Sequence, residues 1–275
     1  MTASTPLVSV IIPSFNEPPE VVRASLESVR NQTFRDFECI VVDESTRPEL
    51  ADACREVCEE DPRFIYLHPA ERLGLPRSLN LALSKSRGRL IARFDSDDIC
   101  AAERLALQVD YLQAHPEISV VGGCLDVIDE SGVKTAHRKY PERPADVAKG
   151  MQWTTAVAHP TVMYRKLAYE SYGGYNPDFR FAEDLDLWLR WLNAGLKFAN
   201  LPQVLVHYRQ IHTRRDPRHW RCNLHARVSN FSGGYPIRRV IGIGCIAIWI
   251  ALPAFAQEYM FRALILRRQS RGDRP

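Results

Sequence analysis

Three carboxylates lie within four positions at Asp95, Asp97 and Asp98, directly after the mostly apolar run at residues 91–94. Like charges at this spacing repel one another, so the cluster is favourable only when it is solvated or shares a cation. A divalent ion held by oxygen ligands, with a phosphate on its other face, suits these residue types. Alternatively, Asp97 and Asp98 are first-turn acids of a helix that begins near Ala102. The cluster by itself leaves both interpretations open.

Length and composition indicate an ordinary globular protein. The chain has 275 residues, 45% of them hydrophobic and 25% charged, which is enough to bury one substantial core. Its seven cysteines include no C-x-x-C pair and no spacing to His that is typical of a zinc site. We therefore expect reduced, mostly buried thiols in a cytosolic environment. No basic region precedes the first apolar run at Leu7, so we expect no secretory signal.

The elements that must position the carboxylates alternate along the first half of the chain. Strands are predicted at residues 7–12, 38–42, 64–67, 90–94 and 119–122. Helices are predicted from Pro18–Pro19 onward and at residues 48–59, 76–86 and 102–115, and a further helix at 183–193. This alternation is typical of an α/β domain with a mainly parallel sheet flanked by helices. After Gly123 the pattern loosens, and antiparallel strands are possible there.

Polar residues follow three of these predicted strands. They occupy residues 13–17, 43–45 and 95–98, each directly after an apolar run. Ligands of open α/β sheets bind outside the carboxyl ends of the strands, so we expect the three ends to line one crevice. The sequence thus predicts a nucleotide-phosphate or metal site at that edge.

Four motifs together resemble those of the family 2 glycosyltransferases. They read V-I-I-P-S-F-N-E at 10–17, I-V-V-D-E-S at 40–45, I-A-R-F-D-S-D-D at 91–98 and E-D-L-D-L-W at 183–188. The resemblance covers roughly residues 7–209. It implies the GT-A fold, a Rossmann-like sheet, and an inverting hexosyltransferase-like enzyme that uses nucleotide-diphosphate sugars and Mg²⁺ or Mn²⁺.

The resemblance also implies roles for individual residues. Pro13, Asn16 and Glu17 would border the nucleotide, and Asp43 would accept a hydrogen bond from the base. The aspartate cluster (Asp95, Asp97 and Asp98) would hold the ribose or sugar and the metal on the diphosphate, with Asp97 the first choice for direct ligation. Asp184 would be the general base. Two departures are Glu44, where many relatives have aspartate, and Arg72, near which asparagine is frequent.

The residue types suit this chemistry without the family name. Inverting transfer needs a carboxylate on the acceptor side to remove the hydroxyl proton, and Asp184 at the start of a helix is suited to this. A metal would neutralise the leaving diphosphate. Alternatively, Glu183 and Asp184 are simply favourable first-turn acids.

Further residues have a functional and a structural interpretation. His159 could lie near the acceptor or diphosphate, as Glu183 could, or could be a structural histidine. Arg209 and His212 could contact the diphosphate or form a solvated surface pair. Trp188 could stack on a sugar ring or serve the core.

The C-terminal part differs in charge from the rest of the chain. Up to Tyr208 there are 23 Lys+Arg and 30 Asp+Glu (23 − 30 = −7), and from Arg209 onward 13 Arg and 3 Asp+Glu (13 − 3 = +10). No nucleic-acid-binding motif is recognisable, and residues 240–256 carry no charge, which favours a membrane surface. We expect a short membrane-embedded or interfacial helix followed by a basic amphipathic segment at 258–268, or alternatively a helix packed on the catalytic domain.

These observations predict three regions: a transferase domain at residues 1–209, a basic linker at 210–236, and a membrane-associated helical segment at 237–275. The predicted function is transfer of a sugar to a glycan or lipid-linked acceptor in cell-surface polysaccharide biosynthesis, at the cytoplasmic face of the membrane. Nucleic acid is not expected as a partner. The alternatives are a non-catalytic nucleotide-sugar-binding protein and a dinucleotide-dependent oxidoreductase. The oxidoreductase is disfavoured because no G-x-G-x-x-G follows the first strand.

Overall fold

The computed structural model describes residues 5–210 and 217–253. Its strands are β1 (Val8–Ser14), β2 (Phe37–Asp43), β3 (Phe64–Leu67), β4 (Leu90–Arg93), β5 (Ile99–Cys100), β6 (Ile118–Ile128), β7 (Lys134–Arg138), β8 (Met163–Arg165) and β9 (Lys197–Arg209). Its α-helices are α1 (Pro19–Arg30), α2 (Pro48–Glu59), α3 (Leu75–Lys85), α4 (Arg104–Ala114), α5 (Pro144–Gly150), α6 (Lys166–Tyr172), α7 (Glu183–Asn193), α8 (Pro217–Ser229) and α9 (Pro236–Ala251). A short 3₁₀ turn covers His159–Thr161.

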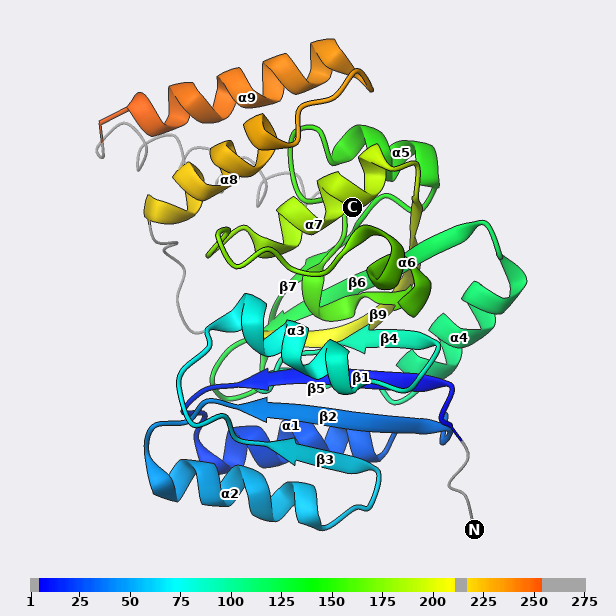
Figure 1. The fold of residues 1–275 in the computed structure, drawn as a ribbon, viewed down its shortest axis with the longest axis vertical. Helices are drawn as coiled ribbons and strands as arrows, with labels where there is room; N and C mark the ends of the chain where they lie inside the picture. Colours follow the sequence, from blue (N-terminus) through cyan, green and yellow to red (C-terminus); the bar gives the residue numbers. More distant parts are fainter. Residues whose placement is uncertain (1–4, 211–216, 254–275) are drawn as a thin grey trace.

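One sheet holds all nine of these strands (Figure 1). Its order is β3-β2-β1-β4-β8-β6-β9-β5, and β7 pairs with β6. Strands β3, β2, β1 and β4 run parallel to one another, as the sequence predicts for the first half of the chain. The second half is mixed, because β8 runs antiparallel to β4 and β6 while β6 and β9 are parallel. Consequently β1, β2 and β4 end at the same edge.

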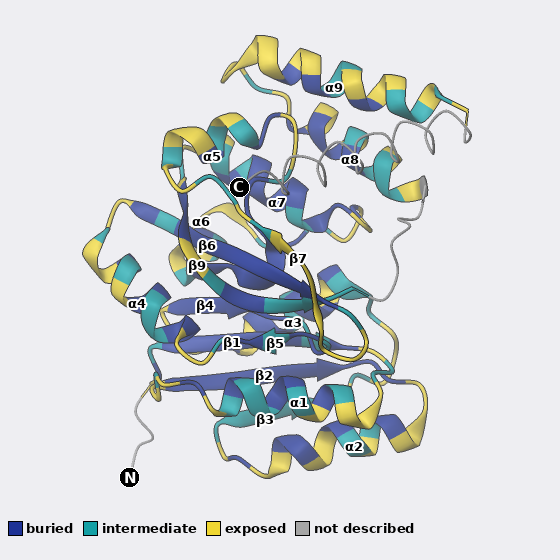
Figure 2. Ribbon diagram, turned by 180° about the vertical axis from the view of Figure 1, so that it is seen from behind, coloured by how far each residue is buried: buried dark blue, intermediate teal, exposed yellow. Residues whose placement is uncertain are grey.

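Helices cover both faces of the sheet, and the strand residues alternate between them (Figure 2). Val10 and Ile12 pack in one apolar cluster with buried residues of α1, α2 and α4. Ile11, between them, packs in a second cluster with residues of α3, α6 and α7. Since successive strand side chains point to opposite faces, a continuous apolar run such as that of β1 requires a sheet covered on both sides.

Local chemistry explains several helix boundaries. Proline occupies the first position of α1 and α2, where its missing N–H costs no hydrogen bond. Gly74 precedes α3 with a φ of 77°, a conformation that favours glycine. Helices α2 and α7 have the bounds that the sequence predicts. All seven cysteines are free and five are buried, which agrees with the expectation of buried thiols.

The C-terminal region departs from the predicted linker at 210–236. Helix α8 lies within that range, and its Arg227 and the following Asn230 are buried. Arg227 donates to the Met151 carbonyl at 2.7 Å, and the Asn230 amide donates to Asp186 on α7 at 2.9 Å. Polar contacts rather than an apolar stripe hold this segment to the domain, so hydrophobic periodicity does not detect it.

Helix α9 contains most of the predicted uncharged run at 240–256. The remainder of that run and the predicted amphipathic segment at 258–268 extend beyond the described residues. None of the helices in residues 5–210 and 217–253 is both long and apolar enough to cross a membrane. Gly242 and Gly244 lie in α9 and not in a strand-to-helix turn, so the structure gives no support to the oxidoreductase interpretation.

Candidate active site

A cavity of about 320 Å³ opens at the edge where β1, β2 and β4 end. We call it the strand-end cavity. Its lining comes from all three polar strand ends, from the loop before α3 and from β9: Pro13, Ser14, Phe15, Glu17, Glu44, Arg72, Gly74, Leu75, Asp95, Ser96, Asp97 and Tyr208. The prediction that these strand ends share one crevice is therefore confirmed.

The aspartate cluster has the geometry of a metal site. One oxygen from each of its three carboxylates lies within 4.8 Å of the others. Asp98 is fully buried, and its Oδ1 accepts a hydrogen bond from the Arg209 N–H at 2.8 Å. Its Oδ2 is buried without a hydrogen-bond partner among the described residues. Because an unpaired buried carboxylate oxygen is costly, a divalent cation fits this donor set.

Electrostatics in the cluster also favour a cation. Burial, followed by the charges of Asp95 and Glu17, raises the pKa of Asp97 to about 7. Burial, followed by the charges of Asp95 and Asp97, raises the pKa of Asp98 well above its usual range. The alternative that Asp97 and Asp98 open a helix is wrong, because β5 follows them and α4 begins only at Arg104.

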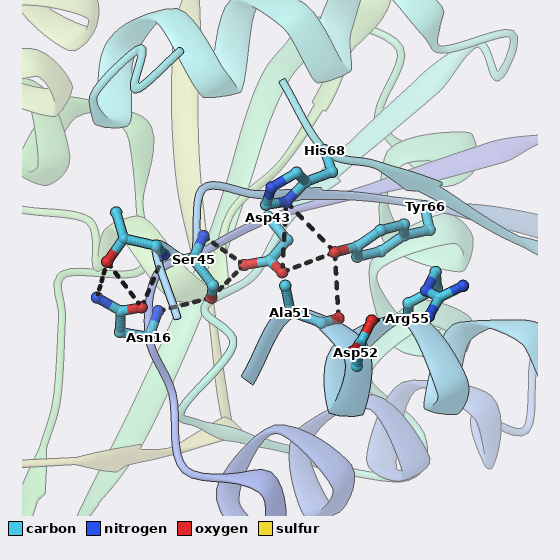
Figure 3. A network of polar contacts seen from close by, with 9 residues as sticks. Asn16, Asp43, Ser45, Ala51, Asp52, Arg55, Tyr66 and His68 are labelled. Carbon is cyan, nitrogen blue, oxygen red and sulfur yellow. Dashed lines mark hydrogen bonds and ion pairs between the residues drawn. The ribbon is translucent and has the colours of Figure 1, made fainter. Parts of the chain in front are cut away.

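Asp43 and Asn16 hold the loop after β2 through hydrogen bonds (Figure 3). Neither residue lines the strand-end cavity. Asp43 is fully buried, and its carboxylate accepts hydrogen bonds from Ser45 N–H at 3.0 Å and Tyr66 O–H at 2.9 Å. Asn16, with a φ of 55°, accepts a hydrogen bond from the Thr46 N–H at 2.9 Å. Of the residues expected to border a nucleotide, Pro13 and Glu17 line the cavity. Base recognition by Asp43 stays a prediction.

Of the two neighbouring carboxylates Asp43 and Glu44, it is Glu44 that lines the strand-end cavity. It accepts hydrogen bonds from Leu73 N–H at 2.5 Å, Gly74 N–H at 2.8 Å and the Ser78 hydroxyl. These bonds hold the loop whose Arg72 guanidinium lies 3.9 Å from the centre of the Phe15 ring. In the sequence, Glu44 is only a departure from the family pattern. In the structure, Glu44 connects the end of β2 to the cavity wall.

A second, larger cavity of about 940 Å³ adjoins the first. We call it the large cavity. Asp184, at the first turn of α7, and His159 line it, and Tyr208 of β9 lines both cavities. Burial, then the charges of Asp95, Asp98 and Asp97, raise the pKa of Tyr208 to about 12, so its hydroxyl stays protonated near neutral pH. The two predicted carboxylate sites thus lie on either side of one tyrosine.

The remaining predicted residues differ in their placement. His159 pairs with the Tyr175 hydroxyl at 2.9 Å, and burial holds its pKa well below the usual value, so it is neutral. Burial, then Asp184, raises the pKa of the buried Glu183 to about 7, and Glu183 lines neither cavity. Arg209 donates to the carbonyl oxygens of Asp97 at 3.0 Å and Glu130 at 2.9 Å, and so secures the turn of the cluster.

Trp188 and His212 complete the predicted site residues. Trp188 is fully buried and packs edge-on against Phe198 and Trp191, each with ring centres 5.6 Å apart. A sugar cannot stack on it in this arrangement, so its acceptor role is corrected to a core role. His212 lies outside the described residues. Sequence reasoning gives no site role to Phe15, Arg72 or Tyr208, although Phe15 lies within a quoted motif and Arg72 is noted as a departure from the family pattern.

Comparisons of the sequence identify related proteins. The family model described as Glycosyl transferase family 2 matches residues 9–173. Amylovoran biosynthesis glycosyltransferase AmsE of Erwinia amylovora is 31% identical over 74% of this chain and 76% of its own length. O-antigen biosynthesis glycosyltransferase WbnJ of Escherichia coli is 33% identical over 76% of this chain and 81% of its own. Putative glycosyltransferase EpsE of Bacillus subtilis is 35% identical, covering 75% and 74%.

Solved structures share the fold. Mannosyltransferase PcManGT from Pyrobaculum calidifontis, in complex with GDP-Man and Mn²⁺, has a TM-score of 0.66 at 20% identity, covering 97% of this chain and 76% of that one. S. aureus TarS 1–349 in complex with UDP-GlcNAc has a TM-score of 0.64 at 16% identity, covering 87% and 71%. These similarities confirm the predicted GT-A fold.

Proposed function

The chain belongs to glycosyl transferase family 2, and from this premise we propose that it transfers a sugar with inversion from a nucleoside-diphosphate donor. The acceptor is a glycan or a lipid-linked glycan in cell-surface polysaccharide biosynthesis. The observation that carries the proposal is the shared wall at Tyr208, which brings the aspartate cluster and Asp184 to adjoining cavities. The names of two relatives, for amylovoran and O-antigen biosynthesis, support the polysaccharide context.

The donor belongs in the strand-end cavity. Phe15 and Arg72 supply an aromatic face and a cation for a nucleotide, and Pro13 and Glu17 complete the wall. Asp95, Asp97 and Asp98 would hold Mg²⁺ or Mn²⁺, which neutralises the negative charge of the leaving nucleoside diphosphate. GDP-Man with Mn²⁺ in PcManGT and UDP-GlcNAc in TarS support a donor of this class.

The acceptor belongs in the large cavity, with Asp184 as the general base. The acceptor oxygen bonds to the anomeric carbon while the bond from that carbon to the diphosphate oxygen breaks. The hydroxyl proton passes to Asp184, and the electron pair of the broken bond leaves with the diphosphate. Attack from the cavity opposite the leaving group inverts the anomeric centre. The N-terminus of α7 favours the ionised carboxylate that accepts this proton.

Asp184→Asn tests the base role. We expect kcat to fall about 10²–10⁴-fold, the usual contribution of a general base, with donor affinity unchanged. The measurements are a screen of UDP-, GDP- and dTDP-sugars for Mn²⁺-dependent binding by calorimetry, followed by transfer assays with the donor that binds. Asp178→Asn makes the same charge change at an exposed position outside both cavities and should leave both quantities unchanged. Full transfer by Asp184→Asn would refute the assignment.

A further inference from the structure

The outward face of α9 is apolar along its whole length. Ile237, Val240, Ile241 and Ile248 are exposed to 75%, 59%, 45% and 65%. Their spacing places them along one side of the helix, whereas Gly242 and Ile246 on the other side are buried. Figure 2 shows exposed residues along α9, which lies at one end of the molecule, beyond α8. We call this surface the α9 face.

Such a face is unusual for a protein surface in water. Single exposed apolar residues are common, but a contiguous stripe marks an interaction site. From Ile237 to Ile248 the stripe extends over about 17 Å, at about 1.5 Å per residue. The stripe contains no charged residue from Val240 to the end of α9.

The segment that carries the α9 face is rich in arginine. Residues 217–253 contain five Arg and no Asp or Glu. Arg218 and Arg221 on α8 and Arg238 on α9 are exposed. The Arg238 guanidinium lies 5.4 Å from the centre of the Trp153 ring, which is itself 42% exposed. Apolar side chains next to arginine and a half-exposed tryptophan match the chemistry of an anionic membrane interface.

We propose that the α9 face docks into the interfacial layer of a membrane that contains anionic lipid. A second copy of this chain suits the face less well, because it would bring two segments without carboxylates against each other. The role of docking rests on the proposed function: a docked enzyme would lie on the same membrane that holds a lipid-linked acceptor.

The docked helix is joined to the large cavity. A β-carbon at Gly242 would lie 2.3 Å from the Gln152 carbonyl oxygen, so α9 packs directly on the backbone there. Residues 154–158 continue from this point into the cavity wall, and His219 and Asn223 of α8 line the same wall. A lipid-linked acceptor bound at the membrane would therefore meet a cavity whose wall is built on the docking helix.

Vesicle co-sedimentation of the full chain tests the proposal. Phosphatidylcholine vesicles with phosphatidylglycerol are compared with vesicles of phosphatidylcholine alone, using the wild type and the double variant Ile241→Glu/Ile248→Glu. We expect about a tenfold or greater loss of affinity for the anionic vesicles in the double variant, since charge on a membrane-facing helix opposes insertion. Leu167→Glu, on α6 and 66% exposed, is the matched control and should bind like the wild type.

Donor binding and the unfolding midpoint are measured for every variant. Unchanged values with lost vesicle binding support docking and separate it from the transferase proposal, which fails independently if no nucleotide sugar binds. Unchanged vesicle binding by the double variant would overturn the α9 face as the docking site. Equal binding to both vesicle types would overturn the anionic-lipid assignment. If the wild type is a dimer, the double variant is a monomer and neither protein binds vesicles, the α9 face is assigned to contact with a second copy.

Discussion

Asp97 lies in a group of carboxylates whose ionisation is unfavourable without a cation. Its pKa in the folded protein is about 7, whereas an unfolded aspartate titrates near 3.9. Because the folded pKa is the higher one, the stabilisation that the protonated form provides is complete below pH 3.9 and is lost as the pH rises to about 7. Metal-free protein is thus penalised at this residue in neutral and alkaline solution.

Asp97→Asn removes this penalty. In the metal-free protein, we compare the unfolding midpoint of the variant with that of the wild type at each pH. We expect this difference to be about 2–4 °C larger at pH 8 than at pH 5, because about 1 kcal/mol produces a shift of that size in a domain of this length. Scanning calorimetry in EDTA measures the difference. Mn²⁺ should stabilise the wild type more at pH 8 than at pH 5, and a difference between variant and wild type that does not depend on pH would contradict the account.

Element-scale contacts connect β2 to the loop before α3. Glu44→Gln removes the negative charge from all three hydrogen bonds and turns an NH₂ group, which cannot accept, toward either the backbone N–H groups or the Ser78 hydroxyl. We expect a loss of about 1–3 kcal/mol of stability and about a tenfold weaker donor affinity, as Arg72 loses its fixed position. Chemical denaturation and calorimetry measure these two effects. Glu49→Gln, exposed on α2, should change neither.

At the same scale, the sequence predicts the regular elements well because their signals are local. Apolar runs and prolines define β1, β2, α1 and α2 within a few residues. It does not predict which carboxylate after β2 reaches the cavity. Successive residues along a strand face opposite sides, so whether Asp43 or Glu44 reaches the cavity depends on the helices packed there. The burial of Trp188 likewise depends on packing against another element, because its ring contacts Phe198 of β9.

The whole molecule carries its charge asymmetrically, −7 before Arg209 and +10 from Arg209 onward. Exposed charges are screened at separations beyond about 10 Å in 0.1 M salt. We expect the affinity for anionic vesicles to fall about tenfold or more between about 0.05 M and about 0.5 M NaCl, since arginines near a membrane contribute about 1 kcal/mol each at low salt. Co-sedimentation across a salt series measures this. An affinity that stays constant across the series would show that the apolar face alone drives binding.

Tyr208 separates the two cavities and belongs to both. This position would couple the affinities for the proposed donor and acceptor. If a bound donor moves the ring toward or away from the large cavity, the acceptor binds more weakly or more tightly by some factor, and the acceptor must change donor affinity by the same factor. A single aromatic side chain would in this way link the affinity for one substrate to the presence of the other.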